Sequence, residues 1–203
     1  MSKTKIKKAW EAELIGKIRS MIEHMYPGSE EELREVYVYE NEDKMKITKR
    51  KSDFRLGFHA WFLLKHEFPS GATAMEMTNS LPMDYFNEKE KKMIKNFLNY
   101  KESLFEILKI SNDKKDYTIK DLADKKVYVV KTIDLPEGFK EKEFIQVIIV
   151  KNMEGNHFFY GTVMSFDIWN KKEFVNEILN EFKIENKIRK EREKEEIEWE
   201  IQK

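Results

Sequence analysis

The sequence predicts an α+β protein, in which N-terminal helices pack on a small five-stranded antiparallel sheet or partly open barrel and a long charged helix follows. Through roughly the first 100 residues, apolar side chains recur every three or four positions, as they do in amphipathic helices. Residues 103–166 then contain short β-branched and aromatic runs separated by turn residues, which is typical of strands. Residues 183–203 hold 14 charged side chains, seven of each sign, and no continuous apolar stripe.

The first two helices are expected before residue 40. An apolar stripe covers residues 6–25, and the Pro-Gly pair at 27–28 ends it. Ser29 stands three residues before Glu32, which is the spacing of a capping box, so a second helix is expected to begin there. Residues 36–39 suit either the end of this helix or a strand.

A mostly buried helix is expected over residues 54–68, the most apolar stretch of the chain. Thr73 precedes Glu76 by three residues, and Asn87 precedes Glu90 by three, so each pair predicts a capping box that opens a further helix. The loop before Thr73 contains a glycine and could bind phosphate at a helix N-terminus, but it lacks the second glycine and the lysine of a P-loop. The cap is therefore the favoured interpretation.

Five strands are expected after residue 103. The first is ambiguous, because its apolar positions also continue the preceding helical stripe. Connections this short normally join antiparallel neighbours. Asp121 and Asp124 fall at strand ends or turns, where aspartate accepts local backbone hydrogen bonds. The predicted strands cover residues 104–110, 116–122, 127–132, 144–151 and 157–163.

A C-terminal helix is expected from Lys171, amphipathic as far as Phe182 and then laced with oppositely charged pairs at i,i+4 spacing. At about 1.5 Å per residue it would be about 50 Å long and would project from the protein. The exposed side chains of Ile197, Trp199 and Ile201 would then dock on a protein partner or on another copy of the chain. The predicted regions are a helical region (1–102), a small β domain (103–166) and this helix (167–203).

Composition disfavours several classes of protein. The 38 basic and 38 acidic side chains balance, so the chain lacks the positive excess of a protein that grips DNA electrostatically. No apolar run approaches the roughly 20 residues of a membrane span or forms a signal-peptide core, so we expect a cytoplasmic protein without membrane contact. There is no cysteine for disulfides or thiolate metal sites, and seven glycines form no cofactor loop, so no cofactor is predicted.

Two weaker sets of residues point to chemistry. His59 and His66 lie seven residues apart, two turns of one helix, and Glu67 follows, so they could form part of a metal or acid–base site of a hydrolase. The stricter zinc signature, with histidines at i and i+4, is absent. The favoured interpretation is structural, with His59 packed beside Trp61 and His66 near the polar end of the helix.

The β domain could bind single-stranded nucleic acid. Tyr128 and Phe159 could stack on bases, and Lys126 and Lys131 could contact phosphates. Lysines at turns are more often simply solvated, so this remains an alternative.

Residues 54–166 resemble a group of uncharacterised prokaryotic proteins that often carry a SEC-C metal-binding tail. The resemblance rests on a Trp-containing helix (58–64), a Gly-Ala-Thr turn (71–73) and an Asp-Leu turn (121–122). It implies an α+β fold of unassigned function and supplies no catalytic residues, and a chain without cysteine cannot form the tail. With no catalytic motif found, the sequence favours a non-catalytic interaction or adaptor module over an enzyme.

Overall fold

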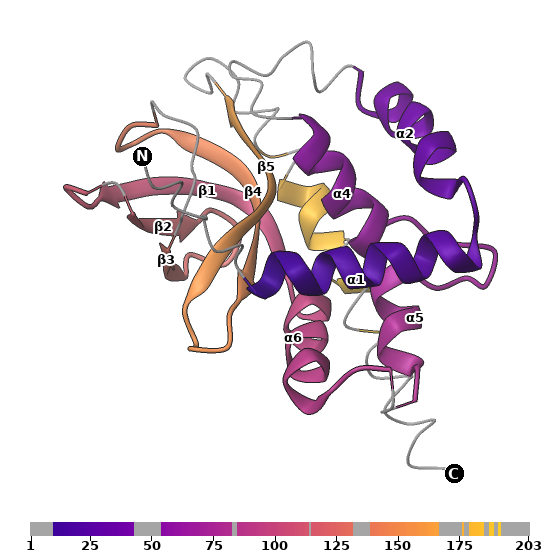
Figure 1. Cartoon of the computed structure of the whole chain (residues 1–203). Coiled ribbons are helices and arrows are strands. Elements are labelled where there is room, and N and C mark those ends of the chain that lie inside the picture. Colours follow the sequence, from indigo (N-terminus) through magenta and orange to yellow (C-terminus); the bar gives the residue numbers. More distant parts are fainter. Residues whose placement is uncertain are drawn as a thin grey trace, which may run out of the picture.

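The computed structural model describes residues 10–42, 54–82, 85–113, 115–131, 139–166, 176, 179–184, 187–188 and 191. It confirms an α+β protein in which helices come first and a five-stranded sheet follows (Figure 1). The helices are α1 (Trp10–Met25), α2 (Ser29–Glu40), α4 (Phe54–Leu64), α5 (Ala74–Ser80) and α6 (Glu88–Leu98). The strands are β1 (Lys101–Ile110), β2 (Asp116–Asp121), β3 (Val127–Lys131), β4 (Phe144–Lys151) and β5 (His157–Phe166).

The sheet is mixed, so the prediction of a purely antiparallel sheet is wrong. Pairing runs in the order β1-β2-β3-β5-β4 and returns from β4 to β1. The β3–β5 seam is parallel and consists of one residue pair, Val130 with His157. The prediction failed because it treated β3 and β4 as neighbours. In the structure β4 pairs with β1 and β5, and it does not pair with β3. Strand β5 then pairs with β4 and meets β3 in the parallel sense.

The ambiguous segment after residue 103 is a strand. Strand β1 pairs with β2 on one side and with β4 on the other, so both edges of its backbone are bonded. Its side chains alternate between two environments: Phe105 and Ile107 lie inside the curled sheet, and Leu104 packs on the outside against Phe182. Burial on both faces explains why the sequence lacks a polar alternation here.

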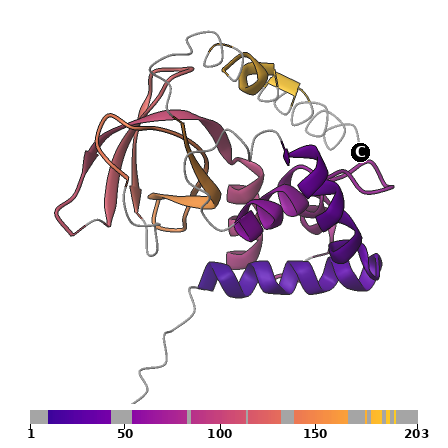
Figure 2. The same ribbon diagram turned by 90° about the horizontal axis from the view of Figure 1, so that it is seen from above.

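Two large apolar cores flank strand β4. Ile145, Val147 and Ile149 point into the sheet interior, while Ile148 and Val150 face the helices. The N-terminal helices therefore lie on one side of the sheet (Figure 2), and β4 is apolar from Phe144 to Val150 apart from Gln146 because both of its faces are covered. The helical core includes Ile18, Phe58, Phe62, Met75, Ile94 and Phe97.

The helix caps follow the sequence at two of three positions. Thr73 with Glu76 and Asn87 with Glu90 form complete capping boxes, as predicted. Helix α2 does begin at Ser29, but its N-cap is Gly28, with φ of 82° and no side-chain hydrogen bond. The Gly28 amide instead donates to Glu23 Oε1 of α1 (2.6 Å), so the predicted Ser29 cap is wrong.

The C-terminal segment packs on the sheet over the part that the structure describes. Residues 179–184 are helical, and Phe182 is buried against Leu104 of β1. Lys187 and Glu191 form one of the predicted i,i+4 ion pairs (3.8 Å). The rest of the predicted long helix, including Ile197, Trp199 and Ile201, lies outside the described residues. None of the described helices is long and apolar enough to cross a bilayer.

Candidate functional site

The two histidines proposed for acid–base or metal chemistry do not share a helix face. Helix α4 ends at Leu64, and the His66 amide donates to Trp61 O (2.9 Å) in the turn that follows. The His66 ring packs between those of Trp61 and Phe68, each with its centroid 4.9 Å away. Glu67 is exposed and makes a backbone bridge to Thr73. The two-turn geometry predicted for these residues is therefore wrong.

The environments of His59 and His66 are those of packed side chains. The His59 ring lies 5.5 Å from that of Phe58. Burial lowers the pKa of His66, and the carboxylates of Glu40 and Glu67 oppose this shift only in part. Among the described residues, no three His, Asp or Glu side chains come together in a group that could hold a metal ion.

The aromatic residues proposed to stack on bases turn toward the sheet interior. Phe159 lies 5.8 Å from Tyr117 between ring centroids, and Tyr128 lies 6.1 Å from Phe105, both edge to face. Lys126 and Lys131, by contrast, are exposed. Lys131 lies on the opposite face of β3 from Tyr128, because alternate residues of a strand point to opposite faces, and Lys126 lies in the turn before β3.

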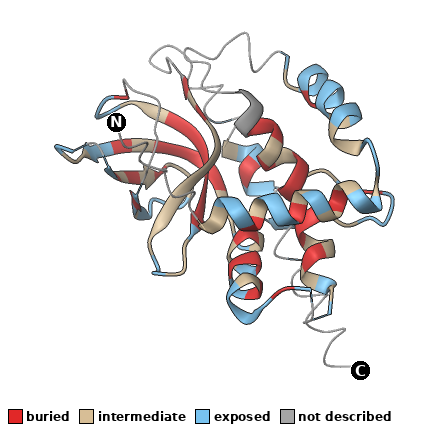
Figure 3. Cartoon of the chain, viewed as in Figure 1, coloured by how far each residue is buried: buried red, intermediate tan, exposed pale blue. Residues whose placement is uncertain are grey.

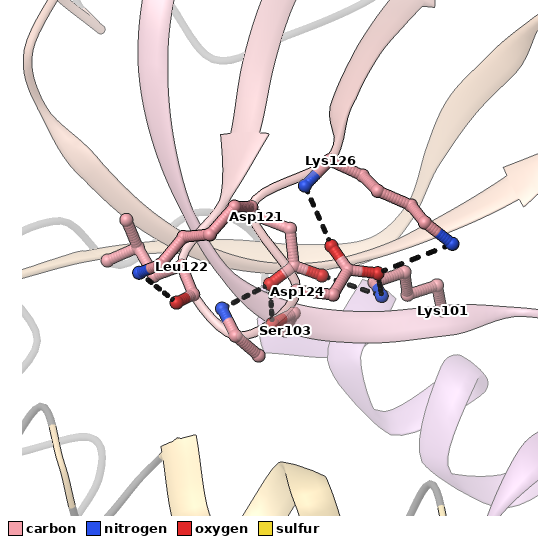
Figure 4. Close-up of polar contacts among 8 residues, drawn as sticks. Lys101, Ser103, Asp121, Leu122, Asp124 and Lys126 are labelled. Atoms are coloured by element: carbon pink, nitrogen blue, oxygen red, sulfur yellow. Dashed lines mark hydrogen bonds and ion pairs between the residues drawn. The ribbon is translucent and has the colours of Figure 1, made fainter.

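An ionic cluster centred on a buried carboxylate joins the β2–β3 hairpin to β1 (Figure 4). Asp121 is fully buried, and its Oδ1 accepts hydrogen bonds from Ser103 Oγ (2.8 Å) and from the Ala123 amide (2.6 Å). Its Oδ2 lies 2.7 Å from Lys101 Nζ, which also contacts Asp124 Oδ2 at 2.8 Å. Asp124 in turn accepts from the Lys126 amide, which confirms the predicted local role of both aspartates.

This cluster is built for fixing the hairpin in place. Burial by itself would lower the pKa of Lys101, but the hydrogen bonds to Asp121 and Asp124 outweigh it and raise that pKa. The lysine is therefore held as a cation between two carboxylates. Ser103 is wholly inaccessible to a substrate. The sequence showed the two turn aspartates but not Lys101 or Ser103, because their partners are about 20 residues away along the chain.

A second polar cluster lies where the helices meet the sheet. Lys65, just after α4, forms an ion pair with Glu102 of β1, and Gln146 Nε2 of β4 donates to Glu102 Oε1 (3.3 Å). Burial, together with the Glu102 carboxylate, raises the pKa of the nearby Tyr37 hydroxyl to about 12. Because Glu102 and Gln146 are buried, this cluster fixes the helical layer on the sheet. Its ion pair and hydrogen bond join residues far apart along the chain, so local sequence does not predict them.

Helix α2 is exposed over most of its length (Figure 3), and its exposed residues include three large apolar ones, Val36, Val38 and Tyr39. Only Tyr37 of this helix is buried. Arg19 of α1 holds Glu30 through two hydrogen bonds, at 3.2 and 2.5 Å, and so fixes the inner side of the helix. Arg34 is exposed as well but pairs with Glu30 on that inner side. We define the outward face of α2 by six of its other exposed residues, Glu31, Glu32, Glu35, Val36, Val38 and Tyr39.

The outward face of α2 combines apolar side chains with carboxylates. Tyr39 is 82% exposed, and Val36 and Val38 are 42% and 43% exposed. Within the described part of the chain, no ion pair is formed by the glutamates at 31, 32 and 35, whereas Glu30 on the inner side pairs with Arg19. Sequence reasoning missed this face, because the alternative of a strand at 36–39 left the orientation of its side chains undefined.

Comparison of the chain with protein-family models, with curated proteins and with solved structures found no match. The resemblance to proteins with a SEC-C tail therefore stays a prediction.

Proposed function

We propose that the protein is a non-catalytic interaction module that docks protein partners on the outward face of α2. The observation that carries this proposal is the exposure of Tyr39, with Val36 and Val38 beside it, on a helix whose opposite side is anchored. Tyrosine is enriched at the centres of protein interfaces, because its ring offers a large contact area and its hydroxyl a hydrogen bond.

The anchoring of α2 favours binding on energetic grounds. Tyr37 packs on Phe58 and Trp61 of α4, with ring centroids 5.8 and 5.4 Å apart. A face that is held in place before binding loses less conformational entropy when a partner docks. The C-terminal residues Ile197, Trp199 and Ile201 stay a prediction as a further contact of the same module.

The proposal is tested by capturing proteins from the cells that express this chain, with Tyr39→Ser compared against wild type. Tyr85→Ser is the matched control, because Tyr85 is also exposed (59%) but lies in the loop before α6. We expect Tyr39→Ser to lose at least one protein that wild type and Tyr85→Ser both retain. Identical sets of captured proteins for all three forms would contradict the proposal.

A second candidate function is binding of single-stranded nucleic acid by the sheet. Support comes from the strand order β1-β2-β3-β5-β4 with a parallel β3–β5 pair, an order found in oligonucleotide-binding folds, where the β2–β3 surface contacts the ligand. On this surface the lysines at 120, 126 and 131 would contact phosphates. Binding of a labelled oligothymidine, measured by fluorescence anisotropy, should then weaken as salt is added. The double variant Lys126→Gln/Lys131→Gln should bind it with lower affinity than wild type. Equal affinity of the variant and wild type would exclude this use of the surface.

A further inference from the structure

Charge is divided between two surfaces although the whole chain is neutral. The outward face of α2 carries Glu31, Glu32 and Glu35, while the one basic residue of this helix, the exposed Arg34, forms an ion pair with Glu30 on the inner side. Glu31 and Glu35 are i,i+4 neighbours, and Glu32 and Glu35 are i,i+3 neighbours, so like charges repel along the helix. A positively charged partner would relieve this repulsion.

The solvent-facing side of strands β2 and β3 is rich in lysine, in contrast to the acidic face of α2. Thr118 pairs with Val129, and Lys120 with Val127, which places these four side chains on one face. Val127 and Val129 are 55% and 52% exposed. We define the outer β2–β3 face by Thr118, Lys120, Val127, Val129 and Lys131, with Lys126 at its edge in the turn before β3.

Lysines predominate on and around the outer β2–β3 face. Glu106 lies opposite Lys120, Asp116 lies opposite Lys131, and Asp124 lies 3.9 Å from Lys126. Those three carboxylates are outnumbered by the five lysines of the same area, at positions 109, 120, 125, 126 and 131. Each of the two surfaces thus combines exposed valines with charges of one dominant sign, and the signs are opposite.

The two surfaces lie at opposite ends of the molecule (Figures 1 and 2). One copy therefore cannot bring its own α2 against its own β2–β3 hairpin. A contact between unlike surfaces of two copies is heterologous, so it extends to a ring or an open chain of copies.

We propose that copies of this chain associate head to tail, with the outward face of α2 of one copy docked on the outer β2–β3 face of the next. The inference rests on the proposed function, because it uses the same α2 surface and names a second copy as its partner. Tyr39 and the valines supply the apolar contacts, and glutamate–lysine pairs supply the charged contacts that govern specificity and association rate.

Charge reversal on each surface tests the pairing. One variant carries Glu31→Lys, Glu32→Lys and Glu35→Lys, and the other carries Lys120→Glu, Lys126→Glu and Lys131→Glu. The matched control reverses three exposed glutamates elsewhere, with Glu13→Lys, Glu88→Lys and Glu154→Lys. Sedimentation velocity over a wide concentration range measures the mass of each, and circular dichroism confirms that each is folded.

We expect the mass of wild type to rise with protein concentration, and the association to weaken by about tenfold or more between low and high salt. Each surface variant alone should stay monomeric, while the control behaves as wild type. A mixture of the two surface variants should assemble again, because each then offers the charge that the other lacks. This recovery is what simple misfolding could not produce.

Three results would overturn the inference: a wild type that is monomeric at every concentration, surface variants that assemble like wild type, or a mixture that fails to recover. The proposed function would survive any of these if Tyr39→Ser still lost a foreign protein in the capture experiment. If the capture experiment also showed no loss, both the proposed function and the head-to-tail association would be contradicted.

Discussion

A single missing side chain lets α4 lie against the sheet. A Cβ atom on Gly57 would meet the Tyr37 hydroxyl and would lie 2.6 Å from Thr162 Oγ1 of β5, closer than real Cβ contacts allow. Both neighbours are themselves held, because Tyr37 is buried and Thr162 belongs to a paired strand. The glycine therefore sets the distance between the helical layer and β5.

Replacing this glycine should destabilise the protein. We expect Gly57→Ala to lower the free energy of unfolding by about 1 to 3 kcal/mol, the usual cost of forcing extra volume into a packed site. Urea denaturation measures the difference.

Gly16→Ala is the control, because Gly16 lies in the middle of α1 and, apart from its chain neighbours and its own helix backbone, no atom lies within 4 Å of the added methyl group. There the better helix propensity of alanine should stabilise the protein by about 1 kcal/mol. Shifts of the same sign in both variants would contradict the packing role of Gly57.

Asp121 and Asp124 show which side-chain contacts can be predicted from local sequence and which cannot. Their hydrogen bonds to the amides of Ala123 and Lys126 are local, so turn chemistry predicts them. Lys101, which neutralises both, comes from a strand that the fold brings alongside. Local sequence holds no information about that pairing, since it depends on the register of β1 against β2.

At the scale of helices and strands, Thr73 and Ser29 stand at the same capping-box spacing, but only Thr73 caps a helix. Thr73 Oγ1 accepts from the Glu76 amide, whereas Ser29 caps nothing, because Glu23 of the preceding helix accepts from the amides of Gly28 and Glu30. The capping-box spacing is the same in both. The neighbouring helix decides the difference.

This contrast gives a paired prediction. Thr73→Ala should lower the free energy of unfolding by about 1 kcal/mol, since a helix cap is lost. Ser29→Ala should change it by less than about 0.5 kcal/mol. Thermal or urea unfolding of the two variants measures both values, and equal losses would show that Ser29 does cap α2.

The end of α4 illustrates the limit of apolar periodicity. The stripe continues to Phe68, so sequence predicts a helix to that point, but the amides of Lys65 and His66 both donate to Trp61 O and the helix stops. Phe68 still reaches the core from the loop, packing on Phe62 with centroids 5.6 Å apart. An apolar side chain can be buried from a turn as well as from a helix, so periodicity alone overruns the boundary.

At the scale of the whole molecule, the seam between β3 and β5 is the thinnest part of the sheet. It contains one backbone pair, and His157 of that pair packs its ring 5.2 Å from Tyr128 of β3. Lys151 of β4 pairs with His157 on the other side. Burial lowers the pKa of His157 below 6.5, and the positive charge of Lys151 adds to that effect.

The lowered pKa values of His157 and His66 predict a fold that weakens in mild acid. Both groups bind protons more readily when unfolded, so their full contribution to stability is present above pH 6.5 and is lost as pH falls through the lower folded pKa values. We expect the free energy of unfolding to fall over that window, and His157→Gln to reduce the slope.

Nuclear magnetic resonance titration of the histidine ring protons provides the direct check. It should place the pKa of His157 and of His66 below 6.5 in the folded protein. Values at or above 6.5, or a slope that His157→Gln leaves unchanged, would contradict the assignment of this acid sensitivity to the rings of His157 and His66.

By itself the sequence determined the α+β class, the approximate ranges of the last four strands, the starts of α2, α5 and α6 and two of the three proposed caps, because these depend on periodicity and on contacts within a few residues. Only the tertiary structure decided the strand order, the buried clusters around Asp121 and Glu102, and the outward face of α2. These depend on which distant segments pack together, and that choice minimises exposed apolar area and unpaired charge over the whole molecule, so no short stretch of sequence encodes it.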